Sequence, residues 1–174
     1  PYNHRRQRQM CIRDSYTAAR VGAVARLKRA DFSEVGGQYA LRFLEKNGQS
    51  REIPVRHDLQ GHLLEYVCGA GLADAKSDTA LFRTAVGRTK RLTEIPMTAN
   101  DMGRMVKRRM RDAGLSPRFS PHSFRVATIT DLLHQGLPLA DVQCLAGHAD
   151  PRTTRLYDRR QKRVTRNIVE RISI

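Results

Sequence analysis

Three prolines in the last third of the chain stand at positions where a helix can begin. Pro121, Pro138 and Pro151 each precede a stretch with apolar residues at helical spacing. Proline has no N–H and a fixed φ, so it suits the first turn of a helix and interrupts a longer one. The prolines therefore predict three short helices, at residues 121–135, 138–146 and 151–159.

An extended pattern lies in the first third of the chain. Residues 38–45 place apolar side chains at alternate positions, and residues 51–55 form a second extended run. Asn47-Gly48 between them is a strong turn signal, because both residues tolerate positive φ. The pattern predicts a β-hairpin in which Pro54 lies near the end of an edge strand.

Hydrophobic spacing and capping residues indicate further helices. Asp58 and Thr98 are expected to cap two of them, since short polar side chains accept hydrogen bonds from the first N–H groups of a helix. Residues 69–97 are rich in Gly, Ala and Thr, and we expect them to be mostly irregular. The fold class predicted is mainly α with a small antiparallel β-sheet (α+β), without a linker that divides it. The further predicted helices are residues 19–28, 58–68, 99–113 and 163–172.

The charge balance indicates a polyanionic partner. Lysines and arginines total 32 against 17 aspartates and glutamates, which gives a formal net charge of +15. A domain this basic is expected to bind nucleic acid, and an ordinary metabolic enzyme with a neutral surface is disfavoured. Lys107 and Arg108 lie on the polar face of the 99–113 helix, and Arg159 and Arg160 follow Tyr157 near the end of the chain. These four residues are candidates for DNA-phosphate contacts.

The cysteine content and the hydropathy of the sequence indicate the cellular compartment in which the protein is expected. Three cysteines at long, unpatterned spacings favour a reducing interior over a disulfide framework or a zinc site, and we expect Cys144 to lie in the core. No apolar run approaches the roughly 18 residues of a membrane span. We therefore expect a cytoplasmic protein without a membrane partner.

Three motifs near the end of the chain carry groups suited to phosphate chemistry. His122 and Arg125 are three residues apart, so they share a helix face near an N-terminus, which itself favours a phosphate. His148 follows Gly147 at the end of a predicted helix, and Tyr157 stands nine residues later. Each motif alone is common on protein surfaces, and only their order and spacing make them informative.

This ordered string resembles the active-site segment of the tyrosine recombinase (phage-type integrase) family. Residues 16–22, Tyr-Thr-Ala-Ala-Arg-Val-Gly, are similar to the segment that supplies the first catalytic arginine of the family, which is Arg20 here. The hairpin at residues 45–54 is similar to the lysine-bearing hairpin of the family, and Lys46 falls at the position of its catalytic lysine. The resemblance covers about residues 16–172 and implies the fold of a tyrosine recombinase catalytic domain.

The resemblance implies that Tyr157 attacks the scissile phosphate of one DNA strand, with no metal and no other cofactor. Arg20 and Arg125 would clamp the non-bridging oxygens, because guanidiniums offer paired donors to the charge that develops there. The product would be a 3′-phosphotyrosine and a free 5′ hydroxyl, which conserves the bond energy for rejoining.

The remaining groups would handle protons. A phenol ionises only well above neutral pH, so His122 would accept or orient the proton of the nucleophile. Lys46 would protonate the leaving 5′ oxygen, and His148 would donate a hydrogen bond to the phosphate. The partners implied are double-stranded DNA and further copies of the chain, in a homo-tetramer on DNA associated with the nucleoid.

The chain also departs from the family pattern. Ala23 stands where many members have an acidic residue three positions after the first arginine, and Ala18-Ala19 replaces a Gly-Leu pair. Members usually carry an N-terminal helical domain that clamps DNA. We therefore expect a truncated catalytic domain, with a basic irregular leader at residues 1–14 and the DNA breaking-rejoining domain at residues 15–174.

Two alternative functions share part of this pattern. A type IB topoisomerase would use the same chemistry to relax supercoils as a monomer, but the compact spacing from His148 to Tyr157 favours a recombinase. A catalytically silent DNA-binding fragment would need only the charge. The presence of all six catalytic residues, Arg20, Lys46, His122, Arg125, His148 and Tyr157, argues against the silent fragment.

Overall fold

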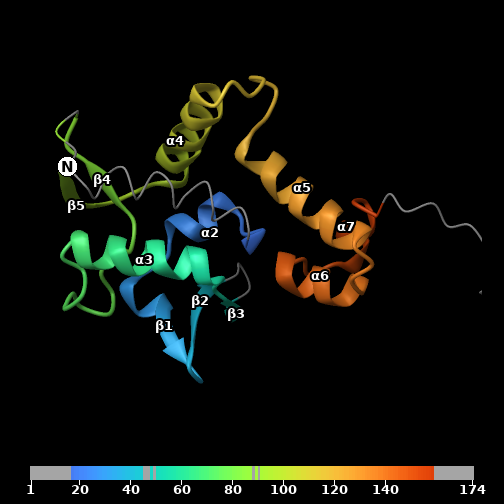
Figure 1. The fold of residues 1–174 in the computed structure, drawn as a ribbon, viewed down its shortest axis with the longest axis horizontal. Helices are drawn as coiled ribbons and strands as arrows, with labels where there is room; N and C mark the ends of the chain where they lie inside the picture. The colour runs from blue at the N-terminus through green and yellow to red at the C-terminus, as the bar shows by residue number, and fades with distance from the viewer. Residues whose placement is uncertain (1–16, 45–47, 49, 88, 90, 159–174) are drawn as a thin grey trace, which may run out of the picture.

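The computed structural model describes residues 17–44, 48, 50–87, 89 and 91–158, and its helices and strands form two packed groups (Figure 1). The first group contains α2, α3, α4 and two small sheets, and the second contains α5, α6 and α7. Each group has its own apolar cluster. The predicted class, mainly helical with small antiparallel sheets, is confirmed.

The larger sheet has the order β1-β2-β3, with strands Phe32–Val35, Gln38–Leu44 and Ser50–Pro54. Strands β2 and β3 pair antiparallel with Leu41 opposite Ile53, as the hairpin pattern predicts. Pro54 ends the edge strand β3, also as predicted. Strand β1 was not predicted, because only Phe32 of its four residues is buried and an alternation is hard to see.

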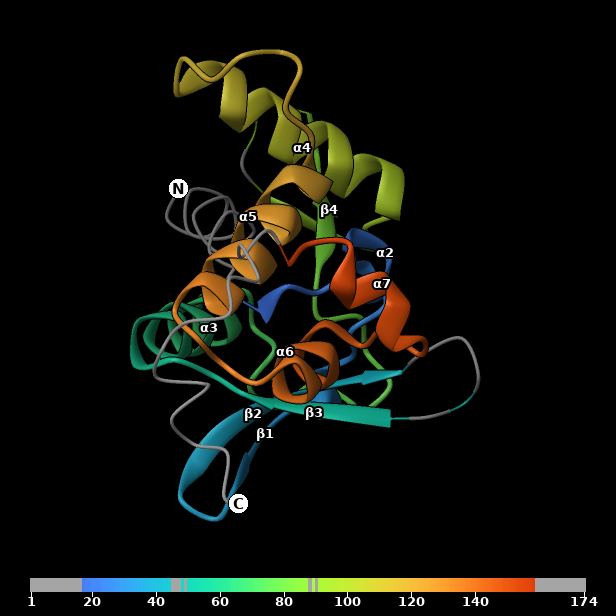
Figure 2. The ribbon, with the colours of Figure 1, turned by 90° about the vertical axis from the view of Figure 1, so that its right-hand side faces the viewer.

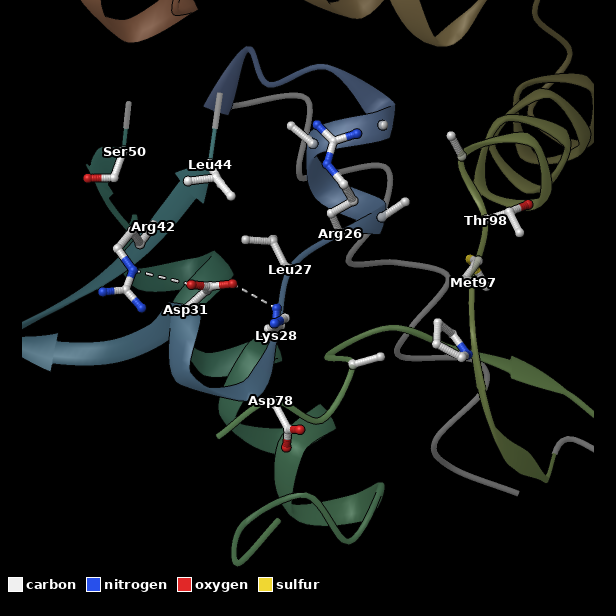
Figure 3. A pocket seen from close by; sticks show the side chains of 16 residues that line it. Arg26, Leu27, Lys28, Asp31, Arg42, Leu44, Ser50, Asp78, Met97 and Thr98 are labelled. Carbon is white, nitrogen blue, oxygen red and sulfur yellow. Dashed lines mark hydrogen bonds and ion pairs between the residues drawn. The ribbon is translucent and has the colours of Figure 1, made fainter. Parts of the chain in front are cut away.

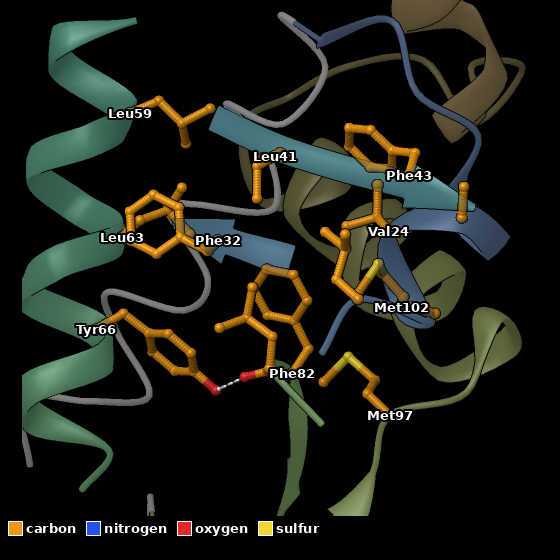
Figure 4. Packing of buried hydrophobic residues seen from close by; sticks show 14 of the residues in the cluster. Val24, Phe32, Leu41, Phe43, Leu59, Leu63, Tyr66, Phe82, Met97 and Met102 are labelled. Atoms are coloured by element: carbon orange, nitrogen blue, oxygen red, sulfur yellow. Dashed lines mark hydrogen bonds between the residues drawn. The ribbon is translucent and has the colours of Figure 1, made fainter. Parts of the chain in front are cut away.

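Helix α3 (His57–Gly69) covers the apolar face of this sheet. Figure 4 shows Leu59 and Leu63 of α3 turned toward side chains of the sheet, and Tyr66 turned toward Phe82, on which its ring stacks. The Tyr66 hydroxyl donates to the carbonyl oxygen of Leu81 at 2.9 Å, which satisfies a polar group inside the core. The predicted cap Asp58 lies inside the first turn, and Arg56 is the residue at the cap position.

The second sheet is a ribbon of β4 (Arg83–Ala85) and β5 (Leu92–Pro96). It lies within the stretch predicted to be mostly irregular, so that prediction was wrong for these strands. The hydroxyls of Thr84 and Thr93 are 2.6 Å apart across the ribbon. Such cross-strand threonine pairs stabilise two paired strands. They do so without the alternation of apolar residues by which a strand is recognised in a sequence.

Helices α2 (Val21–Ala25) and α4 (Ala99–Asp112) pack together beside the sheet. Helix α2 is shorter than the predicted 19–28 helix, and Arg20 is its extended N-cap residue. Thr98 caps α4 as predicted, by accepting from the backbone N–H of Asp101 at 3.1 Å. The methionine-bearing face of α4 is buried, which leaves the arginine-rich face toward solvent.

The second group contains α5 (Pro121–His134), α6 (Leu139–Ala146) and α7 (Pro151–Arg155). The first two are close to the predicted segments, whereas α7 begins as predicted but ends at Arg155, before the predicted end at residue 159. Figure 2 shows α6 next to the β2–β3 strands. Cys144 on α6 is exposed, so its predicted place in the core was wrong. The short helix leaves little buried surface, and Val142 and Ala146 occupy it. The predicted helix at residues 163–172 lies outside the described residues.

Candidate active site

The site is built around the C-terminal end of α6. Gly147 adopts φ 63° and ψ 45°, the left-handed conformation that ends many helices and that glycine adopts most easily. The His148 N–H then donates back to the carbonyl oxygen of Gln143 at 3.2 Å. This turn fixes the direction in which His148 leaves the helix.

Among the described residues, three arginines donate to four successive carbonyl oxygens at this helix end. Arg51 of β3 donates to Cys144 at 3.4 Å and to Leu145. The last carbonyls of a helix lack intrahelical partners and carry partial negative charge, so guanidiniums stabilise them. The other two donors are the predicted catalytic arginines, Arg20 and Arg125.

Arg125 is the buried member of the arginine set. Its residue is 3% exposed, and it donates through Nη2 to the carbonyl oxygen of Ala146 at 2.7 Å and through Nη1 to that of Ala18. Ala18 is the one described residue other than glycine with positive φ, at 51°. Ala18 stands where the family pattern has glycine. Its left-handed conformation directs its carbonyl oxygen toward Arg125.

Arg20 is exposed and lies at the N-terminal end of α2. Its Nη1 donates to the carbonyl oxygen of Gly147 at 3.2 Å. Ala23, at the position of the family's acidic residue, is 7% exposed and packs in the larger core. A main-chain carbonyl of the turn before His148 thus contributes to orienting Arg20, whereas the side chain of Ala23 offers no acceptor.

His148 is 6% exposed, and its Nδ1 lies 2.8 Å from the hydroxyl oxygen of the fully buried Thr154. Burial lowers the pKa of His148 from 6.5 to about 4, with further contributions from the positive charges of Arg125, Arg20, Arg51 and His122. The imidazole is therefore neutral at pH 7, and it can donate from only one of its nitrogens.

Tyr157 follows α7, and its ring stacks on that of His148 with centroids 5.9 Å apart and an angle of 12° between the planes. The side chain is half-buried against the smaller apolar cluster. His122 is exposed in the first turn of α5 and is close enough to influence the pKa of His148. The structure thus gathers Arg20, Arg125, His122, His148 and Tyr157 around one helix end.

Other predicted residues lie elsewhere or are not described. Lys107 and Arg108 are on the exposed face of α4, and Lys46, Arg159 and Arg160 lie outside the described residues. Two residues of the site were not singled out from the sequence: Arg51 and Thr154. The signals were present, since Arg51 belongs to the hairpin motif and Thr154 to the Thr-Thr pair before the tyrosine.

A separate pocket of about 820 Å³ lies between α2, the ends of β2 and β3, and the start of α4 (Figure 3). Its walls include Leu27, Leu44 and Met97, and none of the described catalytic candidates lines it. Inside it, Asp31 accepts from Arg42 at 3.2 Å and from the backbone N–H of Lys28 at 2.9 Å. These bonds stabilise the turn before β1.

Two further features are absent from the segments that the structure describes. Over these segments no three His, Cys, Asp or Glu side chains lie close enough together to hold a metal ion. None of the helices in the described segments has the length and apolar character needed to cross a membrane.

A helical fold with small sheets, and a site of arginines, histidines and a tyrosine at one helix end, define the class. Residues 6–163 match the phage integrase family, so this chain belongs to that family. It is 31% identical over 122 residues to tyrosine recombinase XerD of Pseudomonas putida, a match that covers 69% of this chain and 39% of the relative. It is 26% identical over 158 residues to tyrosine recombinase XerA of Pyrococcus furiosus, with 91% and 51% covered.

The fold is also that of solved tyrosine recombinases. XerH bound to difH in a post-cleavage complex superposes with a TM-score of 0.72 at 24% identity, covering 90% of this chain and 43% of that one. XerA superposes with a TM-score of 0.68 at 20% identity, with 97% and 60% covered. The chain thus spans about two fifths to one half of the curated relatives described above.

Proposed function

We propose that this chain is the catalytic part of a site-specific DNA recombinase that cleaves and rejoins strands through a 3′-phosphotyrosine at Tyr157. The observation that carries the proposal is the stacking of Tyr157 on the neutral His148, beside the helix end that Arg20 and Arg125 bind. The names of the similar relatives, all recombinases, favour this function over DNA relaxation by a topoisomerase.

In the proposed cleavage step, the phenol oxygen of Tyr157 forms a bond to phosphorus and the bond from phosphorus to the 5′ oxygen breaks. The phenol proton passes to His122, and Lys46 supplies a proton to the leaving oxygen. Arg20 and Arg125 stabilise the charge on the non-bridging oxygens. Their bonds to main-chain carbonyls fix the guanidiniums before DNA arrives, which reduces the cost of reorganisation.

His148 is proposed to donate a hydrogen bond to a phosphate oxygen. A neutral imidazole has one N–H, so it can donate this hydrogen bond without first becoming a charged imidazolium. Residues 15–174 are proposed as the DNA breaking-rejoining domain, with residues 1–14 as a basic leader. Strand exchange between two duplexes requires several active sites, so we propose that four copies assemble on double-stranded DNA in the nucleoid.

A covalent-capture experiment tests the chemistry. The protein is incubated with a duplex whose scissile phosphate is next to a nick, so that the cleaved fragment diffuses away and the adduct accumulates. The duplex sequence is selected first from a random pool by binding. We expect a protein–DNA adduct on a denaturing gel, its loss in Tyr157→Phe, and its retention in the control Tyr39→Phe. Intact binding with no adduct would instead favour a catalytically silent DNA-binding fragment.

A further inference from the structure

We propose that Thr154 is a positioning residue whose hydroxyl holds His148 in the tautomer with its proton on Nε2. The inference about the tautomer concerns the protein alone, and its consequence for cleavage rests on the proposed function.

The two side chains are held in place from several sides. The distance from His148 Nδ1 to Thr154 Oγ1 is 2.8 Å, and Thr154 is 0% exposed. The Asp150 side chain accepts from the Arg152 N–H at 2.8 Å, which fixes the start of the helix that carries Thr154. The Thr154 carbonyl oxygen accepts from the Tyr157 N–H at 3.0 Å, so one threonine contacts both the histidine and the tyrosine segment.

The two tautomers of His148 differ in whether the Thr154 hydroxyl and the Nδ1 atom can both be hydrogen-bonded. If Nδ1 carries the proton, it donates to Thr154 Oγ1, and the hydroxyl hydrogen then needs another acceptor in a buried place. Over the described segments, His148 Nδ1 is the hydrogen-bond partner that the structure gives this hydroxyl. Leaving a buried O–H unsatisfied costs roughly 1–3 kcal/mol. The arrangement in which Thr154 donates to an unprotonated Nδ1 satisfies both groups.

The consequence for function follows from the other ring nitrogen. With Nδ1 accepting from Thr154, Nε2 carries the proton and is the ring's only donor. A phosphate oxygen has only lone pairs, so it is attracted by Nε2–H and repelled by a bare Nε2. Burial and the neighbouring positive charges lower the pKa of His148 to about 4, so at pH 7 only one of its ring nitrogens carries a proton. Thr154 would thus select the form of His148 that can bind the phosphate.

Three variants test the inference. Thr154→Val keeps the shape and removes the hydroxyl, Thr154→Ser keeps the hydroxyl, and Thr153→Val changes the adjacent threonine as a control. Long-range proton–nitrogen NMR spectra at pH 7 report which imidazole nitrogen of His148 is protonated, with the signal assigned by its loss in His148→Gln. The same spectra show whether each variant is folded. Adduct formation with the nicked duplex gives the cleavage rate.

We expect His148 to be protonated on Nε2 in the wild type, in Thr154→Ser and in Thr153→Val. In Thr154→Val we expect a detectable Nδ1–H population and a cleavage rate lower by roughly 10- to 100-fold, the effect of losing one buried hydrogen bond. A wild-type His148 protonated on Nδ1 would overturn the inference, even if Thr154→Val fails to fold. So would a folded Thr154→Val with the wild-type tautomer and rate.

The proposed function can fail separately. If the wild type forms no adduct, the proposal for Tyr157 is contradicted, whereas the NMR comparison of the four proteins still decides whether Thr154 sets the tautomer.

Discussion

Arg125 Nη2 donates to the carbonyl oxygen of Ala146 at 2.7 Å, which joins the buried arginine of α5 to the last residue of α6. The same guanidinium donates to Ala18, a residue 107 positions earlier in the chain. One side chain thus connects three segments that carry catalytic candidates. A residue assigned to phosphate binding therefore also has a part in folding.

The first prediction concerns this double role. Arg125→Lys keeps the positive charge. The planar guanidinium donates to both carbonyls through two nitrogens, and the single nitrogen of a lysine ammonium cannot reproduce that geometry. We expect the free energy of unfolding to fall by about 1.5–3 kcal/mol, the range for hydrogen bonds to charged groups. Urea unfolding followed by circular dichroism measures it, with Arg104→Lys on the exposed face of α4 as the control. Equal midpoints for wild type and Arg125→Lys would contradict this role.

The second prediction concerns Ala18, which has φ 51° and is fully buried. A left-handed conformation costs a residue with a Cβ roughly 1–2 kcal/mol, and glycine avoids that cost. Ala146 is equally buried but lies in a right-handed helix, where glycine gains no such advantage. Ala18→Gly should therefore destabilise the protein by roughly 1–2 kcal/mol less than Ala146→Gly does. Thermal unfolding of both variants measures the difference. An equal loss in both would show that Ala18 does not have the left-handed conformation in solution.

The sequence predicted those parts of the molecule whose signals are local. Proline and capping residues placed α5 and the start of α4, and Asn47-Gly48 placed the β2–β3 hairpin. Strand β1 and the β4–β5 ribbon were missed because their stabilisation comes from pairing partners and threonine contacts, not from an apolar alternation.

Some features of the site could likewise be predicted from the sequence, and others could not. The motifs predicted Arg20, Arg125, His148 and Tyr157 as site residues because each has a fixed place in an ordered pattern. Arg20 and Arg125 are attached to the end of α6 through main-chain carbonyls, and any residue type has a carbonyl. No residue pattern encodes such a contact, so it becomes visible only when the segments are folded together.

The third prediction concerns Arg51, which the motif analysis did not separate from the rest of the hairpin. Its guanidinium caps α6 and lies 5.4 Å from the centre of the Phe43 ring. Arg51→Gln should destabilise the protein by roughly 1–3 kcal/mol and loosen the turn before His148. Hydrogen exchange of the Gly147 and His148 amides should accelerate. Arg42→Gln, which breaks an exposed ion pair, should leave those amides unchanged, and protection unchanged in Arg51→Gln would contradict the capping role.

The fourth prediction concerns pH. The pKa of His148 is about 4 in the folded protein and 6.5 as a free side chain, so between these values the unfolded chain binds more protons. Stability should therefore fall as the pH is lowered from 6.5 to 4, by at most roughly 3 kcal/mol in total from this residue. Urea unfolding of wild type and His148→Asn at several pH values isolates the contribution. An NMR titration in which His148 protonates near 6.5 would contradict it.

The last prediction concerns the exposed basic face of α4. If Lys107 and Arg108 contact DNA phosphates, each contact releases counterions, and the logarithm of the binding constant falls with the logarithm of salt concentration by about 0.9 per contact. Lys107→Gln and Arg108→Gln should each reduce the slope by about that amount while weakening binding to different sequences alike. Fluorescence anisotropy at several salt concentrations measures the slope. Lys76→Gln in the exposed loop after α3 changes the net charge equally and should leave the slope unchanged. If all three variants behave alike, net charge explains the binding and α4 does not contact DNA.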